Sequence, residues 1–207
     1  MPILIVLHGA SRNAQENRNQ LIDLSNQKNV IVIAPEFSKT NFPGGDQYNL
    51  GNVFIDGDKP SPSTLNIENE WTFSLIEPLF DQIKELTANK TERYYVFGFS
   101  AGAQFLHRFI FFKPSARIQQ AVAAASGWYT MADASMSFPY GIQNSPLNLN
   151  TFDVIFNKNL TILVGETDND PNAGGLRRNA QADVQGTNRF SRAQYFFNES
   201  QQIANAN

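Results

Sequence analysis

Tyr94-Tyr95-Val96-Phe97-Gly98-Phe99-Ser100-Ala101-Gly102 is the most informative stretch of this 207-residue sequence. Its first part is aromatic and β-favouring, which is typical of a buried strand. The segment 101–112 that follows is rich in alanine and phenylalanine and ends before Pro114, as a helix would. Ser100 lies between the two, with a glycine two residues away on either side. The stretch therefore predicts a strand, a sharp turn at Ser100 and a helix.

Further apolar runs predict four more buried strands, at residues 3–7, 30–34, 120–125 and 160–165. Most runs are continuous rather than alternating, as expected when helices cover both faces of a parallel sheet. Helices are predicted at 14–27, 68–87, 101–112 and 190–204, with a kink at Pro78. This alternation predicts an α/β fold with a doubly wound, mostly parallel sheet of about five strands and helices on both faces. The expected strand order is 2-1-3-4-5.

Size and composition favour a single domain spanning residues 1–207. The formal net charge of −3 gives no reason to expect nucleic acid or an anionic membrane surface as a partner. No apolar run approaches the length of a membrane-spanning helix. The chain has no cysteine, so disulfides and a cysteine nucleophile are excluded, and we expect no cofactor. Oligomeric state and compartment stay open, with the cytoplasm expected if Met1 is the true start.

Two long segments, 38–66 and 126–158, interrupt the alternation and are rich in Gly, Pro, Asn and Ser. Loops of this length in a compact domain are usually functional, although plain surface excursions would also explain them. A group of arginines towards the end of the chain could meet an anionic ligand, but a solvated helix face is the favoured interpretation. These are Arg177, Arg178, Arg189 and Arg192.

The turn at Ser100 also has a chemical interpretation. The pattern Gly98-x-Ser100-x-Gly102 would occur by chance in about one chain of this length in fifteen. Its place between a strand and a helix makes it specific for a nucleophile elbow. The glycines avoid clashes around a strained turn, and the N–H of Ala101 would face the anionic oxygen of a tetrahedral intermediate. An incidental serine in a glycine-flanked turn is the alternative.

A second part of the site is expected at His8-Gly9-Ala10, after the first strand. In the order 2-1-3-4-5 the first and third strands are neighbours, and ligands bind where the chain reverses direction between them. The backbone N–H of Ala10 would then supply a second oxyanion donor, with that of Ser11 as the alternative.

The segment Gly165-Glu166-Thr167-Asp168-Asn169-Asp170 offers the carboxylate that orients the base in a catalytic triad. Asp168 is predicted for this role and Asp170 is the second choice, while a simple Asx-rich turn is the structural alternative. A calcium loop is not indicated. Its sixth and twelfth positions would be Ala173 and Asn179 instead of glycine and glutamate.

With these motifs in this order, the chain resembles the esterase and polyhydroxybutyrate-depolymerase-like branch of the α/β-hydrolases. The resemblance implies cleavage of a small-molecule carboxylic ester through an acyl-enzyme at Ser100. It further implies that Asp168 is the acid and that Ala10 and Ala101 hold the oxyanion. The residues expected to line the substrate pocket are His8, Gly9, Trp128 and Tyr129.

The family places its catalytic histidine after the acid, whereas this sequence contains only His8 and His107. His107 would lie about 10 Å along the helix from Ser100, too far for the roughly 3 Å contact of a general base. His8 belongs to the oxyanion loop and is a weak candidate for an improvised base. The strands that precede Ile3 in the family are also missing. We therefore expect a fragment of a larger hydrolase, or else a degenerate paralogue, with weak activity at most.

A non-catalytic, flavodoxin-like domain that binds a small molecule is the alternative function, because it shares the strand order 2-1-3-4-5. It is less favoured because His8-Gly9-Ala10-Ser11-Arg12 lacks a glycine-rich phosphate fingerprint. A peptidase of the same fold is a third possibility.

Overall fold

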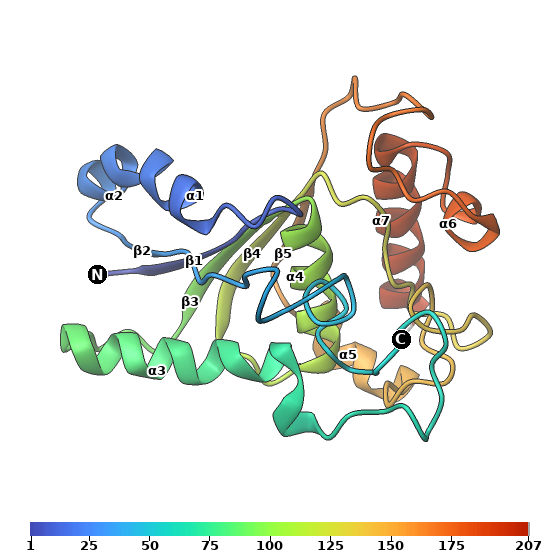
Figure 1. Ribbon diagram of the computed structural model, residues 1–207, viewed down its shortest axis with the longest axis horizontal. Helices are drawn as coiled ribbons and strands as arrows, with labels where there is room; N and C mark the ends of the chain where they lie inside the picture. Colours follow the sequence, from blue (N-terminus) through green and yellow to red (C-terminus); the bar gives the residue numbers. More distant parts are fainter. Residues whose placement is uncertain (207) are drawn as a thin grey trace.

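The computed structural model describes residues 1–206 and contains one five-stranded sheet in the order β2-β1-β3-β4-β5 (Figure 1). All four strand pairings are parallel. The strands are β1 (Ile3–Leu7), β2 (Ile31–Ile33), β3 (Tyr94–Phe99), β4 (Ile118–Ala124) and β5 (Leu160–Leu163). The predicted α/β class, the five strands and their order are confirmed.

Helices lie on both sides of this sheet. In Figure 1, α1 (Ala14–Gln20) and α2 (Ile22–Lys28) lie above it, and α3 (Ile76–Thr87) and α4 (Ala101–Phe112) lie below. The later helices are α5 (Phe152–Phe156), α6 (Ala180–Val184) and α7 (Arg189–Ala206). Three short 3-10 helices complete the set: η1 (Glu68–Glu70), η2 (Thr72–Leu75) and η3 (Leu149–Thr151). Among the described helices, none combines the length and apolar character needed to cross a membrane.

Two helix predictions were wrong in detail. The predicted kinked helix 68–87 is instead η1, η2 and then α3, which begins at Ile76. Pro78 therefore lies in the first turn of α3, where backbone N–H groups have no partner within the helix and proline is tolerated. The predicted helix 14–27 is two helices that meet at Leu21. The helices α5 and α6 were not predicted, because five residues are too few to show a helical period.

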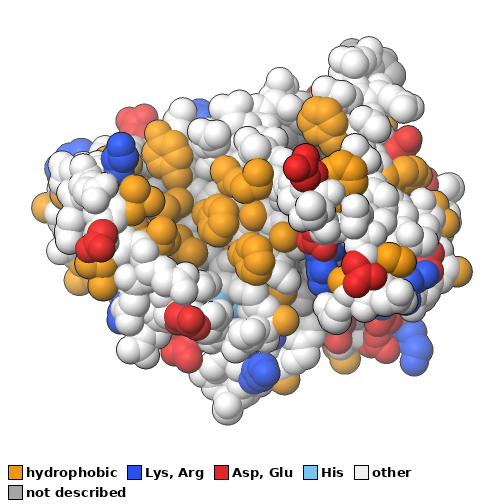
Figure 2. All heavy atoms as spheres, turned by 90° about the horizontal axis from the view of Figure 1, so that it is seen from above, with side chains coloured by type: hydrophobic (Ala, Val, Ile, Leu, Met, Phe, Trp, Pro, Cys, Tyr) orange, Lys and Arg blue, Asp and Glu red, His pale blue; other side chains and the backbone are white. Residues whose placement is uncertain are grey.

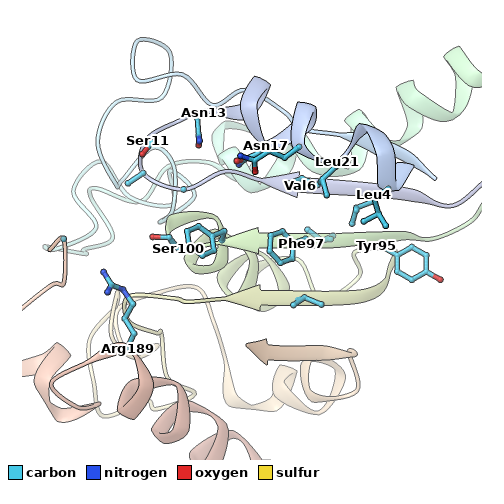
Figure 3. A pocket seen from close by; sticks show the side chains of 18 of the residues that line it. Leu4, Val6, Ser11, Asn13, Asn17, Leu21, Tyr95, Phe97, Ser100 and Arg189 are labelled. Carbon is cyan, nitrogen blue, oxygen red and sulfur yellow. The ribbon is translucent and has the colours of Figure 1, made fainter. Parts of the chain in front are cut away.

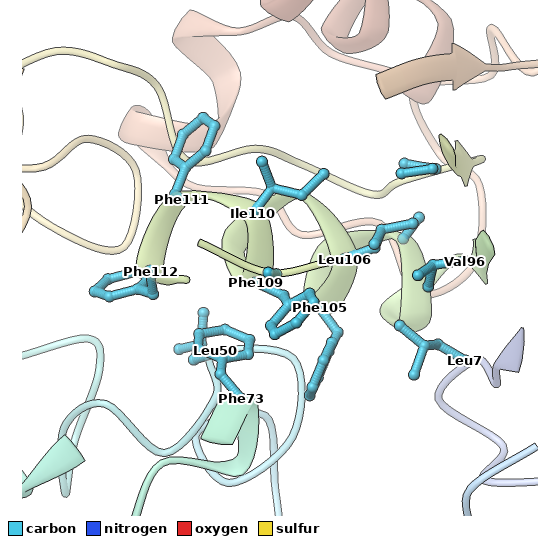
Figure 4. Close-up of a cluster of buried hydrophobic side chains, with 14 of the residues drawn as sticks. Leu7, Leu50, Phe73, Val96, Phe105, Leu106, Phe109, Ile110, Phe111 and Phe112 are labelled. Carbon is cyan, nitrogen blue, oxygen red and sulfur yellow. The ribbon is translucent and has the colours of Figure 1, made fainter. Parts of the chain in front are cut away.

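The core lies below the sheet around α4, whose residues are all buried. Figure 4 shows three of its phenylalanines on the side of Phe73 of η2, namely Phe105, Phe109 and Phe112. Leu106 points towards Val96 of β3. The ring of Phe73 lies 4.8 Å from that of Phe105 and 5.7 Å from that of Phe112, measured between centroids. This packing fixes α4 against the sheet. It thereby fixes the turn at Ser100 from which α4 starts.

The two faces of β3 are covered to different extents. Tyr94 and Val96 are buried below the sheet, whereas Tyr95 and Phe99 on the opposite face are 38% and 51% exposed. Figure 2 shows hydrophobic side chains gathered in the middle of the face seen from above. Helices thus lie on both faces of the sheet as predicted, but they cover the two faces unequally at β3. Its apolar sequence favours burial on both sides, but within residues 1–206 only one side of β3 is packed under helices.

Candidate active site

Ser100 stands on a strained turn between β3 and α4, with φ 54° and ψ −111°. A Cβ added to Gly98 would overlap the backbone of Gly102, and one added to Gly102 would overlap the carbonyl oxygen of Leu7. The N–H of Ser100 donates to the carbonyl oxygen of Ala124 at 2.9 Å, which ties the turn to β4. The glycine pattern thus has a steric cause, and the strain is maintained by the packing around it.

The segment after β1 lies directly against this turn. A Cβ on Gly9 would be 3.7 Å from the Cβ of Ser100. Residues 9–12 form a tight turn closed by the Arg12 N–H, which donates to the carbonyl oxygen of Gly9 at 3.1 Å. Within residues 1–206, the N–H groups of Ala10 and Ala101 donate to no backbone carbonyl. Both are therefore free to donate to a ligand, the second because it begins a helix.

The His8 side chain is fully buried and is not among the residues that line the pocket at Ser100. Its Nε2 accepts a hydrogen bond from the Phe37 N–H at 3.1 Å, so its Nδ1–H donates to the carbonyl oxygen of Gly9 at 3.0 Å. Burial also lowers the pKa of the imidazole. With both ring nitrogens occupied, His8 can neither act as a base nor contact the substrate through its ring. The expectation that His8 lines the substrate pocket is corrected accordingly.

His107 is equally unavailable. Its Nδ1 hydrogen-bonds to the Ala103 carbonyl oxygen at 3.1 Å, and its Nε2 accepts from the Thr130 N–H at 3.0 Å. Complete burial moves its pKa well below the ordinary value. His8 and His107 are the only histidines of the sequence, and both ring nitrogens of each are engaged in hydrogen bonds within the fold.

Asp168 does not itself line the pocket at Ser100, but it contacts Arg189, which does. Its Oδ1 accepts a hydrogen bond of 3.2 Å from Arg189 Nη1, and its carbonyl oxygen accepts from the Phe190 N–H. Arg189 extends from the start of α7 towards Ser100 (Figure 3) and lines the same groove. Asp170 instead accepts a hydrogen bond from the Asn172 N–H within its own turn. Of the two carboxylates, Asp168 is thus the one that contacts a side chain lining the groove.

A groove of about 970 Å³ runs from Ser100 along the exposed face of β3. At the Ser100 end it is lined by Ala10, Ser11 and Arg189, and further along by Phe97 and Tyr95. Five residue steps along a strand span about 17 Å, which gives the approximate length from Ser100 to Tyr95. Besides these residues, the lining includes the polar side chains of Asn13, Asn17, Gln20 and Gln120.

Trp128 and Tyr129 lie elsewhere. Trp128 is buried between the guanidinium groups of Arg108 and Arg177, 4.1 and 4.9 Å from its ring centroid. Tyr129 is fully buried and stacks on Phe196 of α7 at 4.4 Å. Both side chains build the interior between α4 and α7 instead of lining the groove, so the predicted substrate contacts are corrected.

The four arginines near the end of the chain do not form the solvated helix face that was expected. They are Arg177, Arg178, Arg189 and Arg192. Arg192 is fully buried and donates to the Gly127 carbonyl oxygen and to Asp183. Arg177 and Arg178 form ion pairs with Asp58 and Asp183. Arg189 alone among the four lines the groove. No local sequence signal separates it from the others, because all four lie in polar sequence.

Comparison with known proteins gives no match to a model of a protein family, and no curated protein matches. Two solved structures match over nearly the whole chain. Poly(aspartic acid) hydrolase-1 from Sphingomonas sp. KT-1 is 38% identical with a TM-score of 0.91, and the match covers 100% of this chain and 76% of that one. LpqC, a poly(3-hydroxybutyrate) depolymerase from Bordetella parapertussis, is 29% identical with a TM-score of 0.89, covering 99% and 68%. Two hydrolase relatives favour a hydrolase over a flavodoxin-like binding domain.

Proposed function

Because this chain belongs to the α/β-hydrolases, we propose that it is a serine hydrolase that cleaves carboxylic esters through an acyl-enzyme at Ser100. The observation that carries the proposal is the strained backbone of Ser100, at φ 54°, with Gly9 of the neighbouring turn against it. A non-glycine residue in the left-handed region is uncommon, and such strain concentrates at functional sites.

In this mechanism the Ser100 hydroxyl attacks the ester carbonyl carbon and its proton passes to a base. The carbonyl oxygen becomes an oxyanion, which accepts hydrogen bonds from the N–H groups of Ala10 and Ala101. The bond to the alcohol oxygen then breaks, and the alcohol leaves with the proton from the base. Water then attacks the acyl carbon while the base takes its proton, the bond from the acyl carbon to the Ser100 oxygen breaks, and a carboxylic acid leaves as Ser100 regains its proton from the base. One oxyanion donor is worth about 100-fold or more in rate in other serine hydrolases.

The base is the element that these residues do not supply, since His8 and His107 are both engaged. We propose that it is a histidine outside the 207 residues, oriented by Asp168. The exposed face of β3 supports this, because parallel sheets normally have both faces covered. The polypeptide that brings the histidine would also cover Tyr95 and Phe99. Both relatives are longer than their matched parts, at 76% and 68% coverage.

Labelling with a fluorophosphonate tests the nucleophile. We expect slow, single-site labelling on the peptide that contains Ser100, identified by mass spectrometry, and none in Ser100→Ala. Ser11→Ala is the matched control, since Ser11 lines the same groove and keeps its backbone N–H. Labelling that persists in Ser100→Ala would exclude Ser100 as the nucleophile.

A longer form of the protein tests the base and the ester chemistry. Hydrolysis of p-nitrophenyl acetate and butyrate should be weak for the 207-residue chain, because without its base a serine hydrolase keeps only a small part of its rate. A form extended by the downstream coding sequence, where that encodes a histidine, should gain several orders of magnitude. No gain in the extended form would overturn the ester-hydrolase proposal.

Arg189 favours a second candidate, hydrolysis of a substrate that carries carboxylates. It is the only charged side chain among the described residues of the groove, and one relative is named for poly(aspartic acid). Its guanidinium would hold a substrate carboxylate while Ser100 attacks the neighbouring carbonyl. In Arg189→Gln, hydrolysis of p-nitrophenyl hemisuccinate should fall more than that of p-nitrophenyl butyrate. Equal losses would mean that Arg189 acts through Asp168 instead.

A further inference from the structure

The orientation of the Ala10 N–H is set by the other end of the same peptide unit. The carbonyl of Gly9 and the N–H of Ala10 share one planar peptide and point in opposite directions. The Gly9 oxygen accepts two hydrogen bonds, from His8 Nδ1 at 3.0 Å and from the Arg12 N–H at 3.1 Å. Holding this oxygen in place therefore also fixes the direction of the Ala10 N–H, and Ala10 lines the groove. Whatever fixes Arg12 therefore fixes the donor.

Arg12 does not hold this position through its backbone preference. Its φ of 61° lies in the left-handed region, which is strained for a residue with a side chain. Strain of this kind persists only where surrounding contacts maintain it. Besides the backbone hydrogen bond to Gly9, the Arg12 side chain supplies such contacts.

The Arg12 guanidinium binds main-chain carbonyls of a single distant segment. Nη1 donates to the Phe37 oxygen, and Nη2 donates to the oxygens of Phe42 and Gly44 at 3.1 and 2.8 Å. In the described part of the chain it forms no ion pair with a carboxylate. Five donors in a rigid fork suit this three-carbonyl contact, which the single ammonium of lysine cannot reproduce.

Tyr48 joins the same segment to the turn a second time. Its ring lies under the Arg12 guanidinium at 4.2 Å, and its hydroxyl donates to the His8 carbonyl oxygen at 2.6 Å. Tyr48 is fully buried, so this hydroxyl has no competing water. The Phe37 N–H to His8 ring contact is a third link. Segment 37–48 therefore contacts the turn on both sides of Gly9, through hydrogen bonds to His8 and Arg12.

We propose that Arg12 and Tyr48 are positioning residues that aim the Ala10 N–H at the oxyanion. The first part of the insertion 38–66 then belongs to the catalytic machinery as a support for the oxyanion turn. This inference rests on the proposed function of Ser100. It assigns Arg12 and Tyr48 no contact with the substrate.

The test uses Arg12→Gly and Tyr48→Phe, with Arg18→Ala as control because Arg18 on α1 bonds only to Asn19. Glycine tolerates a φ of 61°, so Arg12→Gly removes the side chain without adding backbone strain. The rate of fluorophosphonate labelling is measured in whichever of the two forms above labels faster. We expect a fall of at least 10-fold in Arg12→Gly, a smaller fall in Tyr48→Phe and no change in Arg18→Ala. With p-nitrophenyl butyrate, kcat should fall while KM stays within about 2-fold.

Propylguanidine, the group that Arg12→Gly removes, should at millimolar concentration restore part of the labelling rate of this variant, measured at a temperature where the variant is already fully folded. A merely structural role would not give this pattern. If Arg12→Gly does not fold, the test uses Tyr48→Phe alone, because this change removes only the hydroxyl group that donates to the His8 carbonyl oxygen. Wild-type rates in both variants would overturn this inference while leaving Ser100 as the nucleophile. Absence of labelling in the wild type of both forms would instead overturn the proposed function.

Discussion

Gly102 at the start of α4 lies so close to Leu7 at the end of β1 that a single added carbon would overlap the Leu7 carbonyl oxygen. The contact joins the two halves of the site, because the nucleophile turn precedes Gly102 and the oxyanion turn follows Leu7. The backbone of a central strand cannot move aside for a side chain, unlike the end of a flexible residue. The spacing between Ser100 and Ala10 therefore depends on a glycine at position 102.

Gly102→Ala should lower the free energy of unfolding by about 1–3 kcal/mol, as overpacking of a core does. It should also abolish labelling of Ser100, because relief of the overlap pushes α4 away from β1. Urea unfolding and fluorophosphonate labelling measure the two effects. Gly165→Ala is the control, since a Cβ there would meet no atom within 4 Å. A Gly102→Ala protein that labels normally would contradict this account.

Ser100→Gly should be more stable than Ser100→Ala by about 1 kcal/mol, since glycine relieves the strain of a positive φ. Neither variant should be labelled, so stability and function change in opposite directions at this position. Urea unfolding measures the difference between the two variants. At Ser25, inside α2, the same pair should show the reverse order, because glycine destabilises a helix by about 1 kcal/mol relative to alanine.

The two buried histidines predict a loss of stability in mild acid. Burial lowers both pKa values from the ordinary 6.5, so below pH 6.5 the unfolded state binds more protons than the folded state. Stability should therefore be constant above about pH 7 and fall as the pH drops below 6.5, by up to about 1.4 kcal/mol per pH unit for each histidine. Urea unfolding between pH 5 and 8 measures this slope.

His107→Gln identifies the contribution of one histidine. A glutamine does not titrate, so this variant should show a shallower loss between pH 6.5 and 5 than the wild type, whatever its stability at pH 8. His107 is chosen because it lies on α4 away from the groove. Parallel slopes for the two proteins would show that His107 takes up no proton on unfolding in this range.

Phe73→Ala should lower the free energy of unfolding by about 3–5 kcal/mol, because it leaves a cavity against the buried rings of α4. Phe73 is fully buried, whereas Leu86 on α3 is 77% exposed. Leu86→Ala is thus the matched control and should change stability by less than about 0.5 kcal/mol. Thermal unfolding of the three proteins side by side measures both effects.

Local sequence was enough to predict the frame of the site. The apolar runs located all five strands, and the glycines around Ser100 located the turn, since strand propensity and steric demands at a tight turn act over a few residues. The strand order expected for one common type of doubly wound sheet was confirmed, although alternation of strands and helices alone does not distinguish it from other orders. Short elements such as α5 and the break before α3 could not be predicted, because their hydrogen bonds form only once neighbouring segments are in place.

The direction in which each side chain points could not be predicted from the sequence and was decided only by the tertiary structure. Nothing near His8 in the sequence indicates that Phe37 occupies its ring, and nothing near Trp128 indicates that two arginines enclose it. Arg189 enters the groove while Arg192, three residues later, is buried, because α7 docks against β5 at one particular rotation. Such contacts join residues far apart in the sequence, and their energies depend on the packing of whole elements rather than on any local pattern.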